Sequence, residues 1–490
     1  MFDNVRRMSR QLLAYGTADV SVLAINVLLL PIYTRVLSPA EYGAFALLLV
    51  FEAFVKPVLR CGLDAAYLRH YFEYRTAVER RTLGHTVFLF AAALNGAALL
   101  VLWPLAPWLT QALIGSQRYV FAVRLVASNI ALSNLVFLPL AQFRAEERST
   151  LVGTLNFSRS FATTVLRLVL VVGLRRGVTG LALADVVVTA GLVLGLSGSL
   201  WRMARGRFST PMLKEVLRYG FPQVPTGVLS QVMAMSDRYV LGMYLALDRV
   251  GVYSIGATMA SVLKLFPVAF ETAWMPFAFS ALHRRDAPAV FARMATYAFT
   301  VLAFSALGAT LLADPVVRLA LPRTFQEAPT VVPLLVLGII FQVAAWFLNT
   351  SLNVAKRTSV YPITTAAGAV ATLVGSVVCI PLWGLRGAAM GTVWGQVALF
   401  GATAWVAQRT YRIPYEIGRL TKTAAVTVAL FAVGTIARTG SPWMDLVVSA
   451  ALLAAFPLLL LAVRFLRHWE REAIGQHVRA LRRRPRGVVP

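Results

Sequence analysis

Charged residues are scarce in this sequence. Of its 490 residues, 14% are charged and 58% are hydrophobic, whereas an ordinary soluble protein has about 25% charged and about 45–50% apolar residues. The composition excludes a disordered chain, a collagen and a coiled coil. It also argues against a soluble globule, because that much apolar surface could not be hidden from water. We therefore expect an all-α integral membrane protein that crosses the bilayer many times.

Acidic residues are fewer than basic ones. There are 21 Asp and Glu against 47 Lys and Arg, which gives a net charge of +26. In a soluble protein such an excess would suggest nucleic acid. In a membrane protein, Lys and Arg keep loops on the cytoplasmic side. We therefore expect no nucleic-acid partner.

Cysteine and histidine are too few to support metal or redox chemistry. The two cysteines, Cys61 and Cys379, both lie in apolar stretches, and the five histidines form no HxxxH or HExxH pattern. These counts exclude a disulfide framework and give no metal-ligand spacing. We expect neither a cofactor nor a metal site.

Long apolar runs recur along the whole chain. A transmembrane helix needs about 20 mostly apolar residues, and such runs predict about 14 spans. Basic residues precede the first run, but no small-residue cleavage site follows it, so we interpret it as a retained helix rather than a signal peptide. The predicted spans are 11–33, 42–66, 83–104, 120–141, 151–173, 180–200, 219–244, 251–277, 291–313, 330–353, 362–383, 386–407, 423–438 and 445–465.

The basic residues alternate from loop to loop. With the N-terminus inside, 33 of the 47 Lys and Arg fall in inside segments and 9 in outside segments. This asymmetry predicts that both termini are cytoplasmic, in a multi-pass protein of the membrane. The basic tail after the last span is then expected to lie on anionic lipid.

Two short patterns repeat in order. LLAYG at 12–16 matches VLRYG at 216–220, and Tyr33 and Tyr42, nine residues apart, match Tyr244 and Tyr253. The repeat predicts a duplication of six spans, and because six is even the two halves insert in the same orientation. The predicted organisation is an N-terminal six-helix lobe (1–200), a basic cytoplasmic linker (201–217), a C-terminal six-helix lobe (218–410), two extra transmembrane helices (411–466) and a basic cytoplasmic tail (467–490).

Three segments resemble a known family. LLLPIYTRVLSPAEYGAFALLL (28–49), CGLDAAYLRHYFEYR (61–75) and SDRYVLGMYLALDRVGVYSIG (236–256) are similar to Wzx-type polysaccharide and O-antigen flippases. These belong to the multidrug/oligosaccharidyl-lipid/polysaccharide (MOP) exporter superfamily. The resemblance covers about residues 1–410. It implies a two-lobed helical transporter with a central cavity, and the two extra helices depart from the twelve-helix pattern of many members.

The resemblance also implies a function. The expected substrate is an oligosaccharide repeat unit on undecaprenyl diphosphate, moved from the cytoplasmic to the periplasmic leaflet of a bacterial inner membrane by alternating access. Membrane lipids, a polysaccharide polymerase and chain-length proteins are the partners it implies. A lipid II flippase and a cation or drug antiporter of the same superfamily stay open as alternatives. A membrane enzyme is disfavoured, because the outer loops at about 105–119 and 314–329 hold no acid pair or nucleophile–base set.

Ionisable residues inside predicted spans are costly and by default face a cavity or a partner. Glu52, Lys56, Arg60 and Asp64 follow one another at four-residue spacing on the second span. Either this ladder neutralises itself at a helix interface or it forms the polar wall of a cavity. For a cavity that accepts a diphosphate, the predicted ligands are Lys56, Arg60, Arg124, Arg159, Arg167 and Lys264.

Amides and tryptophans form further stripes. Asn156 lies on a polar stripe of the fifth span, Gln342, Trp346 and Asn349 share a stripe of the tenth, and Trp274 lies on a stripe of the eighth. Tryptophan stacks on sugar faces and amides bond sugar hydroxyls, although the same residues are common at helix interfaces. We predict that these five residues contact sugar.

The energy source is left open by the sequence. A proton gradient, a sodium gradient or the membrane potential could drive turnover. If an ion is coupled, the in-span acids Asp19, Asp237 and Glu271 are the candidates.

Overall fold

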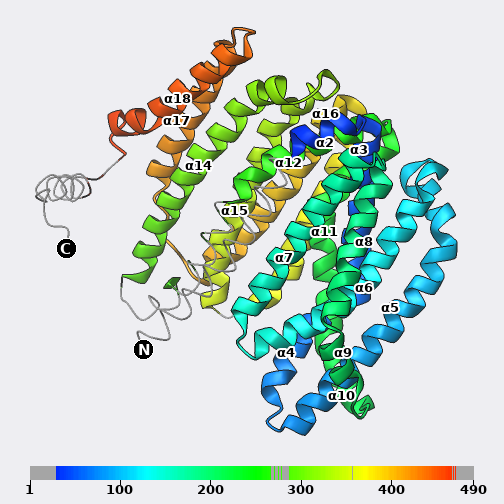
Figure 1. Cartoon of the computed structure of the whole chain (residues 1–490). Coiled ribbons are helices and arrows are strands. Elements are labelled where there is room, and N and C mark those ends of the chain that lie inside the picture. The colour runs from blue at the N-terminus through cyan, green and yellow to red at the C-terminus, as the bar shows by residue number, and fades with distance from the viewer. Residues whose placement is uncertain are drawn as a thin grey trace, which may run out of the picture.

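The computed structural model describes residues 29–265, 286–355 and 357–465, together with positions 267, 270, 274, 277, 278, 467 and 470. Within these residues every regular element is a helix (Figure 1). The all-α prediction is therefore confirmed. Most of the first predicted span and most of the basic tail lie outside the described residues.

The helices follow the predicted order. The N-terminal lobe contains α2 (Leu30–Val36), α3 (Pro39–Arg60), α4 (Leu63–Glu73), α5 (Ala77–Ile114), α6 (Val120–Ala145), α7 (Ser149–Leu168), the π-helical turn η2 (Val169–Gly173) and α8 (Gly177–Gly195). The connection to the next lobe contains α9 (Ser197–Ala204) and α10 (Thr210–Gly220). The C-terminal lobe contains the short turn η3 (Phe221–Gln223), α11 (Val224–Tyr244), α12 (Leu247–Ser261), η4 (Val262–Lys264), α14 (Ala287–Ala320), α15 (Val332–Val354) and α16 (Tyr361–Thr410), and it is followed by α17 (Ile417–Ile436) and α18 (Pro442–Ala462).

Ten helices in the described part of the chain are long and apolar enough to cross a membrane. One of them, α16, has 50 residues and contains a non-helical break at Gly384, with φ 55° and ψ −124°. The break falls between the predicted spans 362–383 and 386–407, so α16 holds both. The predicted seventh span corresponds to α11, and the first part of the predicted eighth span corresponds to α12 and η4. The structure thus has a helix over most of the described residues of each predicted span.

The second predicted span begins and ends at identifiable signals. Ser38 accepts a hydrogen bond from the Glu41 backbone N–H at 3.2 Å, and the Glu41 carboxylate accepts one from the Ser38 backbone at 3.1 Å. This reciprocal cap fixes the start of α3, with Pro39 in its first turn. The helix ends at Arg60, because Cys61 and Gly62 adopt left-handed backbone angles with φ of 51° and 66°. The expectation of one uninterrupted helix to residue 66 is therefore wrong, and Asp64 lies on α4.

Each lobe packs around its own central helices, and the lobes meet along α3. Helices α5, α6 and α8 pack together in the first lobe, and α11, α15 and α16 in the second. Helix α3 contacts α6 and α8 on one side and α11 and α12 on the other. One core of buried apolar side chains, including Leu47, Ile130, Leu241 and Tyr253, runs through both lobes at this junction.

The last two helices are peripheral. Helices α17 and α18 pack against α14 and each other, at the edge of the molecule in Figure 1. Their apolar contacts include Leu307, Leu430 and Phe456.

A buried polar cluster lies at one end of α17. The Arg419 side chain bonds Glu416 at 2.9 Å and Glu470 at 3.1 Å. Tyr297 of α14 also donates a hydrogen bond to Glu470. The cluster therefore ties the chain beyond α18 to α17 and α14.

The connection between the lobes is folded rather than extended. Helix α10 packs against α4 and α5. The Tyr74 hydroxyl donates a hydrogen bond to Glu215 at 2.9 Å, and the Ser209 backbone N–H donates one to the Thr86 hydroxyl at 3.0 Å. The predicted basic linker thus forms two short helices held on the N-terminal lobe.

Candidate functional site

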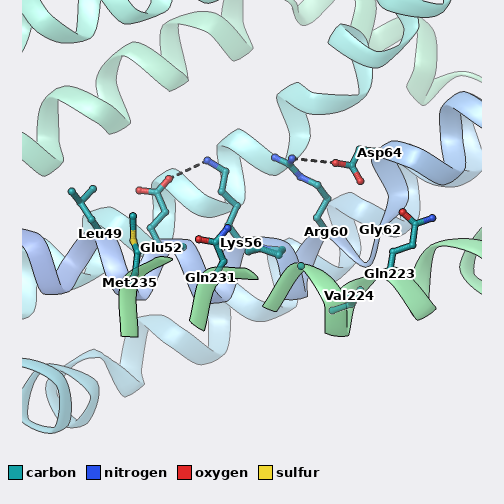
Figure 2. Close-up of a pocket in the computed structure, with 13 residues that line it drawn as sticks. Leu49, Glu52, Lys56, Arg60, Gly62, Asp64, Gln223, Val224, Gln231 and Met235 are labelled. Carbon is teal, nitrogen blue, oxygen red and sulfur yellow. Dashed lines mark hydrogen bonds and ion pairs between the residues drawn. The ribbon is translucent and has the colours of Figure 1, made fainter. Parts of the chain in front are cut away.

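A cavity of about 530 Å³ lies between α3 and α11, where the two lobes face each other. We call it the inter-lobe chamber. Figure 2 shows Glu52, Lys56 and Arg60 on one wall and Gln223 and Gln231 on the facing chain. The lining residues are Leu49, Glu52, Ala53, Lys56, Pro57, Arg60, Gly62, Asp64, Gln223, Val224, Gly227, Gln231 and Met235.

The charged ladder of the second span forms this wall and is paired along it. The Lys56 ammonium lies 3.1 Å from Glu52 Oε1, and Arg60 Nη1 lies 3.5 Å from Asp64 Oδ2 (Figure 2). Both interpretations of the ladder therefore hold, since it neutralises itself and also lines a cavity. Arg60 Nη2 makes no hydrogen bond with any described residue, so the guanidinium keeps donors for a ligand.

A hydrogen-bonded chain supports Glu52 from behind. Asn129 on α6 donates to Glu52 Oε1 at 3.5 Å and accepts from Thr189 on α8 at 2.8 Å. Arg159 on α7 donates to the same Thr189 hydroxyl at 3.3 Å. Arg159 therefore belongs to the scaffold behind the chamber and does not line it.

A second set of amides supports Arg60. Arg60 Nε donates to Asn134 Oδ1 at 3.4 Å, and Asn134 Nδ2 donates to Asn95 Oδ1 at 2.9 Å. Asn95 and Asn134 are both buried. Because buried amides satisfied in this way have one favoured orientation, they hold the Arg60 guanidinium at the chamber wall.

Two other predicted diphosphate ligands are engaged elsewhere. Arg167 makes a bidentate pair with Asp185, with contacts of 3.0 and 2.7 Å. Arg124 donates to the Trp103 carbonyl oxygen at 3.3 Å and lies over the Trp103 ring. The structure brings neither residue to the lining of the chamber.

A second cavity, of about 250 Å³, lies within the C-terminal lobe. We call it the C-lobe pocket. Met235 lines both cavities, so they adjoin at this side chain. The lining residues are Met233, Ala234, Met235, Asp237, Arg238, Ala257, Thr258, Ala260, Ser261, Lys264, Leu335, Gly338, Ile339, Gln342, Thr392 and Gln396.

Lys264 and Asp237 have contrasting surroundings in the C-lobe pocket. Asp237 accepts hydrogen bonds from the hydroxyls of Tyr253 at 2.5 Å and Thr392 at 3.3 Å, and Arg238 Nη1 lies 3.4 Å from its other oxygen. Although Asp237 and Arg238 are sequence neighbours on α11, the Arg238 side chain reaches back to this carboxylate. By contrast, no described residue forms a hydrogen bond or an ion pair with Lys264. The structure places Lys264 in this pocket and not beside Lys56 and Arg60.

The structure does not bring the predicted sugar ligands together at one site. Gln342 lines the C-lobe pocket. Trp274 is buried in an aromatic cluster, and its indole N–H donates to the Thr350 hydroxyl at 3.0 Å. Trp346 packs on the apolar core. Neither Asn349 nor Asn156 lines either cavity.

Of the three ion-coupling candidates, the structure describes one. Asp19 and Glu271 lie outside the described residues. Asp237 is buried, with both carboxylate oxygens engaged as above. In the described part of the chain, no group of His, Cys, Asp and Glu has the arrangement of a metal site.

Several polar residues of the site were not predicted. They are uncharged: Asn95, Asn129, Asn134, Gln223, Gln231 and Gln396. A buried amide inside an apolar span needs a partner for the same reason as a charge. Counting every in-span amide, and not only those on stripes, would have identified them.

Close backbone contacts flank the chamber along α3. A Cβ atom on Gly43 would lie 2.0 Å from the Leu247 carbonyl oxygen, and one on Gly251 would lie 1.9 Å from that of Pro39. Toward the other end of α3, a Cβ on Gly62 would lie 2.1 Å from the Gly220 carbonyl oxygen. Only glycine permits these approaches. The chamber therefore lies between two places where the lobes touch backbone to backbone.

The fold is shared with solved transporters. The inward-closed lipid II flippase MurJ matches with a TM-score of 0.73 and 13% identity, over 92% of this chain and 99% of that chain. An inward-facing MATE multidrug transporter of the MOP superfamily matches with a TM-score of 0.67 and 14% identity, over 82% and 96%. A MOP transporter from Pyrococcus furiosus, described as having a binding pocket of reversed polarity, matches with a TM-score of 0.53 and 14% identity, over 85% and 97%.

Sequence comparison places the chain in a family. No curated protein matches it, but the family model described as "Polysaccharide biosynthesis protein" matches residues 32–330. The family match and the fold shared with solved transporters both agree with the predicted membrane transporter. Since the match covers more than half of the sequence, the chain belongs to the polysaccharide biosynthesis protein family and has the fold of MOP-superfamily transporters.

Proposed function

We propose that the protein flips an undecaprenyl-diphosphate-linked oligosaccharide repeat unit from the cytoplasmic to the periplasmic leaflet. The observation that carries the proposal is the inter-lobe chamber, a cavity between the two lobes whose lining includes the charged ladder and two glutamines. A diphosphate cannot cross hydrocarbon without compensation, because burying an unpaired charge is strongly unfavourable. The chamber offers a route on which the headgroup keeps polar partners.

Lys56 and Arg60 are the proposed diphosphate ligands. Each is already held by an acid of the same ladder, and each keeps N–H donors that no described residue uses. Arginine presents a planar fork to phosphate oxygens, which an ammonium does not. Gln223 and Gln231 line the facing wall, and their amides are the proposed partners of the groups next to the diphosphate. The lipid tail stays in the bilayer and leaves the chamber between the lobes.

Lipid analysis of a strain that lacks the gene tests this function. We expect one undecaprenyl-diphosphate oligosaccharide to accumulate on the cytoplasmic side, and the wild-type gene to restore its export. Arg60→Ala should fail to restore export although the protein is inserted normally. An unchanged pool of lipid-linked oligosaccharide, with a loss of drug efflux instead, would support a cation or drug antiporter.

A lipid II flippase is the second candidate. The structural match to MurJ covers 92% of this chain and 99% of that chain. Lipid II also carries a sugar on a prenyl diphosphate, so the same chamber could accept it. Lipid analysis of the same gene-deletion strain distinguishes the two candidate functions. Only the lipid II flippase function predicts that lipid II accumulates and that cell-wall synthesis stops.

A further inference from the structure

The C-lobe pocket has an excess of positive charge. The described ionisable residues of its lining are Asp237, Arg238 and Lys264. Asp237 already binds Arg238, with 3.4 Å between Oδ1 and Nη1. Lys264 has no such partner among the described residues, whereas both cations of the inter-lobe chamber are paired. Among the described lining residues, the pocket therefore has one positive charge without a counter-charge.

One lining residue of the same pocket carries an unsatisfied acceptor. Gln396 is 5% exposed, and its Oε1 accepts no hydrogen bond from the described residues. Leaving a buried acceptor without a donor is unfavourable, so such an atom usually marks a missing partner. Gln342, Thr258 and Ser261 add further amide and hydroxyl groups to the lining. The combination suits a ligand that carries both an anionic group and hydroxyls.

The walls of the pocket restrict which part of a lipid-linked substrate can enter. They come from α11, α12, η4, α15 and α16, all within the C-terminal lobe. A group attached directly to a prenyl tail could not enter without the tail crossing these packed helices. A sugar at the other end of the substrate could enter from the inter-lobe chamber, because the two cavities adjoin at Met235.

We propose that the C-lobe pocket binds an acidic sugar of the oligosaccharide, with Lys264 pairing with its carboxylate and Gln342 and Gln396 bonding its hydroxyls. This inference rests on the proposed function and names the substrate class, a repeat unit with a carboxylate. A single carboxylate matches the single uncompensated charge. The diphosphate, tied to the tail, stays in the inter-lobe chamber beside Lys56 and Arg60.

Binding to the purified full-length protein in lipid nanodiscs tests the inference. The two probes are short-chain prenyl-diphosphate disaccharides that differ only in the terminal sugar, glucuronate in one and glucose in the other. We expect the wild-type protein to prefer the glucuronate probe by about tenfold or more, the effect of one charge-assisted contact. Lys264→Gln should abolish this preference and leave affinity for the glucose probe unchanged.

Two further variants serve as controls. Lys264→Arg keeps the charge and should keep most of the preference. Lys422→Gln removes an exposed lysine of α17, distant in sequence from both cavities, and should behave as wild type. If Lys264→Gln does not fold, Gln342→Glu adds a negative charge to the same pocket and should also abolish the preference.

The possible contrary results have different meanings. An equal loss of affinity for both probes in Lys264→Gln would show that Lys264 binds the diphosphate. That result would overturn the acidic-sugar assignment and leave the flippase function intact. Equal wild-type affinity for the two probes would also overturn it. If the wild-type protein bound neither probe, the proposed function itself would fail and this inference with it.

Discussion

At the scale of single residues, the arginines of the N-terminal lobe differ in what they touch. Arg60 lines the inter-lobe chamber and has unused donors, whereas Arg124 lies against Trp103 and Arg167 is locked to Asp185. From the sequence alone, all three are basic residues inside predicted spans, and each is equally a predicted diphosphate ligand. The direction of an arginine side chain depends on neighbours far along the chain, and no local pattern encodes these neighbours.

This difference predicts an order of effects on transport. Arg60→Ala should cost about 1.5–3 kcal/mol of substrate binding, roughly a tenfold to hundredfold weakening, and Arg60→Lys should restore only part of it, since lysine lacks the bidentate fork. Arg124→Ala should leave transport close to wild type. Initial rates at equal levels of inserted protein measure this. Equal losses for Arg60→Ala and Arg124→Ala would favour the interpretation based on sequence alone.

Glu470 predicts a pH dependence outside the membrane. Burial by itself would raise the pKa of Glu470, but hydrogen bonds from Tyr297 and the Arg467 backbone and the charge of Arg419 outweigh it, so the pKa is lowered. A lowered pKa in the folded state means that the ionised carboxylate stabilises the fold. That contribution is present at neutral pH and is lost as the pH falls from the ordinary glutamate range through the lower folded pKa.

Thermal unfolding in detergent from neutral to acidic pH tests this. Glu470→Gln should be less stable than wild type at pH 7, and the difference should shrink as the pH falls below the ordinary range of glutamate. Asp248→Asn, at an acid that forms no ion pair with a described residue, is the control for general acid effects. A difference between Glu470→Gln and wild type that is independent of pH would contradict the account.

At the scale of elements, the sequence predicts where helices lie better than where they end. The apolar runs locate every described span, because the bilayer imposes a helix on them. They do not locate the break at Cys61 and Gly62, or the extension of α5 to Ile114 and of α14 to Ala320. The break lies at the close approach of Gly220 to Gly62, and the extensions bury Ala106, Ile114 and Val317 in the apolar core that both lobes share. Neither changes the local hydropathy.

The contact of α3 with α12 predicts an effect for a single methyl group. Gly43→Ala places Cβ at 2.0 Å from the Leu247 carbonyl oxygen, so the two helices must separate. We expect a lower unfolding temperature and slower transport, because this end of the chamber can no longer close. Gly96→Ala on α5 is a matched control, since nothing lies within 4 Å of its Cβ. There the change should raise stability by up to about 1 kcal/mol, the helix-propensity difference.

The two variants are compared by thermal unfolding and by transport rate. Gly43→Ala with wild-type stability and rate would mean that the backbone contact does not hold the lobes together. Loss of stability in Gly96→Ala would mean that the effect is a general response of these helices to alanine.

At the scale of the whole molecule, the charge asymmetry predicts the orientation. Reporter fusions should place the connection at 205–209 and the chain after Arg464 in the cytoplasm. The turns at 115–119 and 321–327 should be external. These turns are shorter than the outer loops expected from the sequence, because α5 and α14 continue into them. An external C-terminus would show that α17 or α18 does not cross the membrane.

The overall architecture follows from the sequence more directly than the site does. The duplication and the even number of spans predict two lobes in the same orientation, and a chamber between them is a consequence of that geometry. The ladder on α3 correctly indicates one wall. The sequence does not indicate that Lys264 lies in a separate pocket, since the separation arises from how α11, α12, α15 and α16 pack.

The most direct test of the central claim is a translocation assay with the full-length protein in proteoliposomes. A fluorescent prenyl-diphosphate oligosaccharide is placed in both leaflets, and its accessibility to an external sugar-cleaving enzyme is followed with time. The account predicts that the cleaved fraction rises from the outer-leaflet share to nearly the whole pool, and that Arg60→Ala slows this rise about tenfold or more. A cleaved fraction that stays at the outer-leaflet share, as in protein-free vesicles, would contradict it.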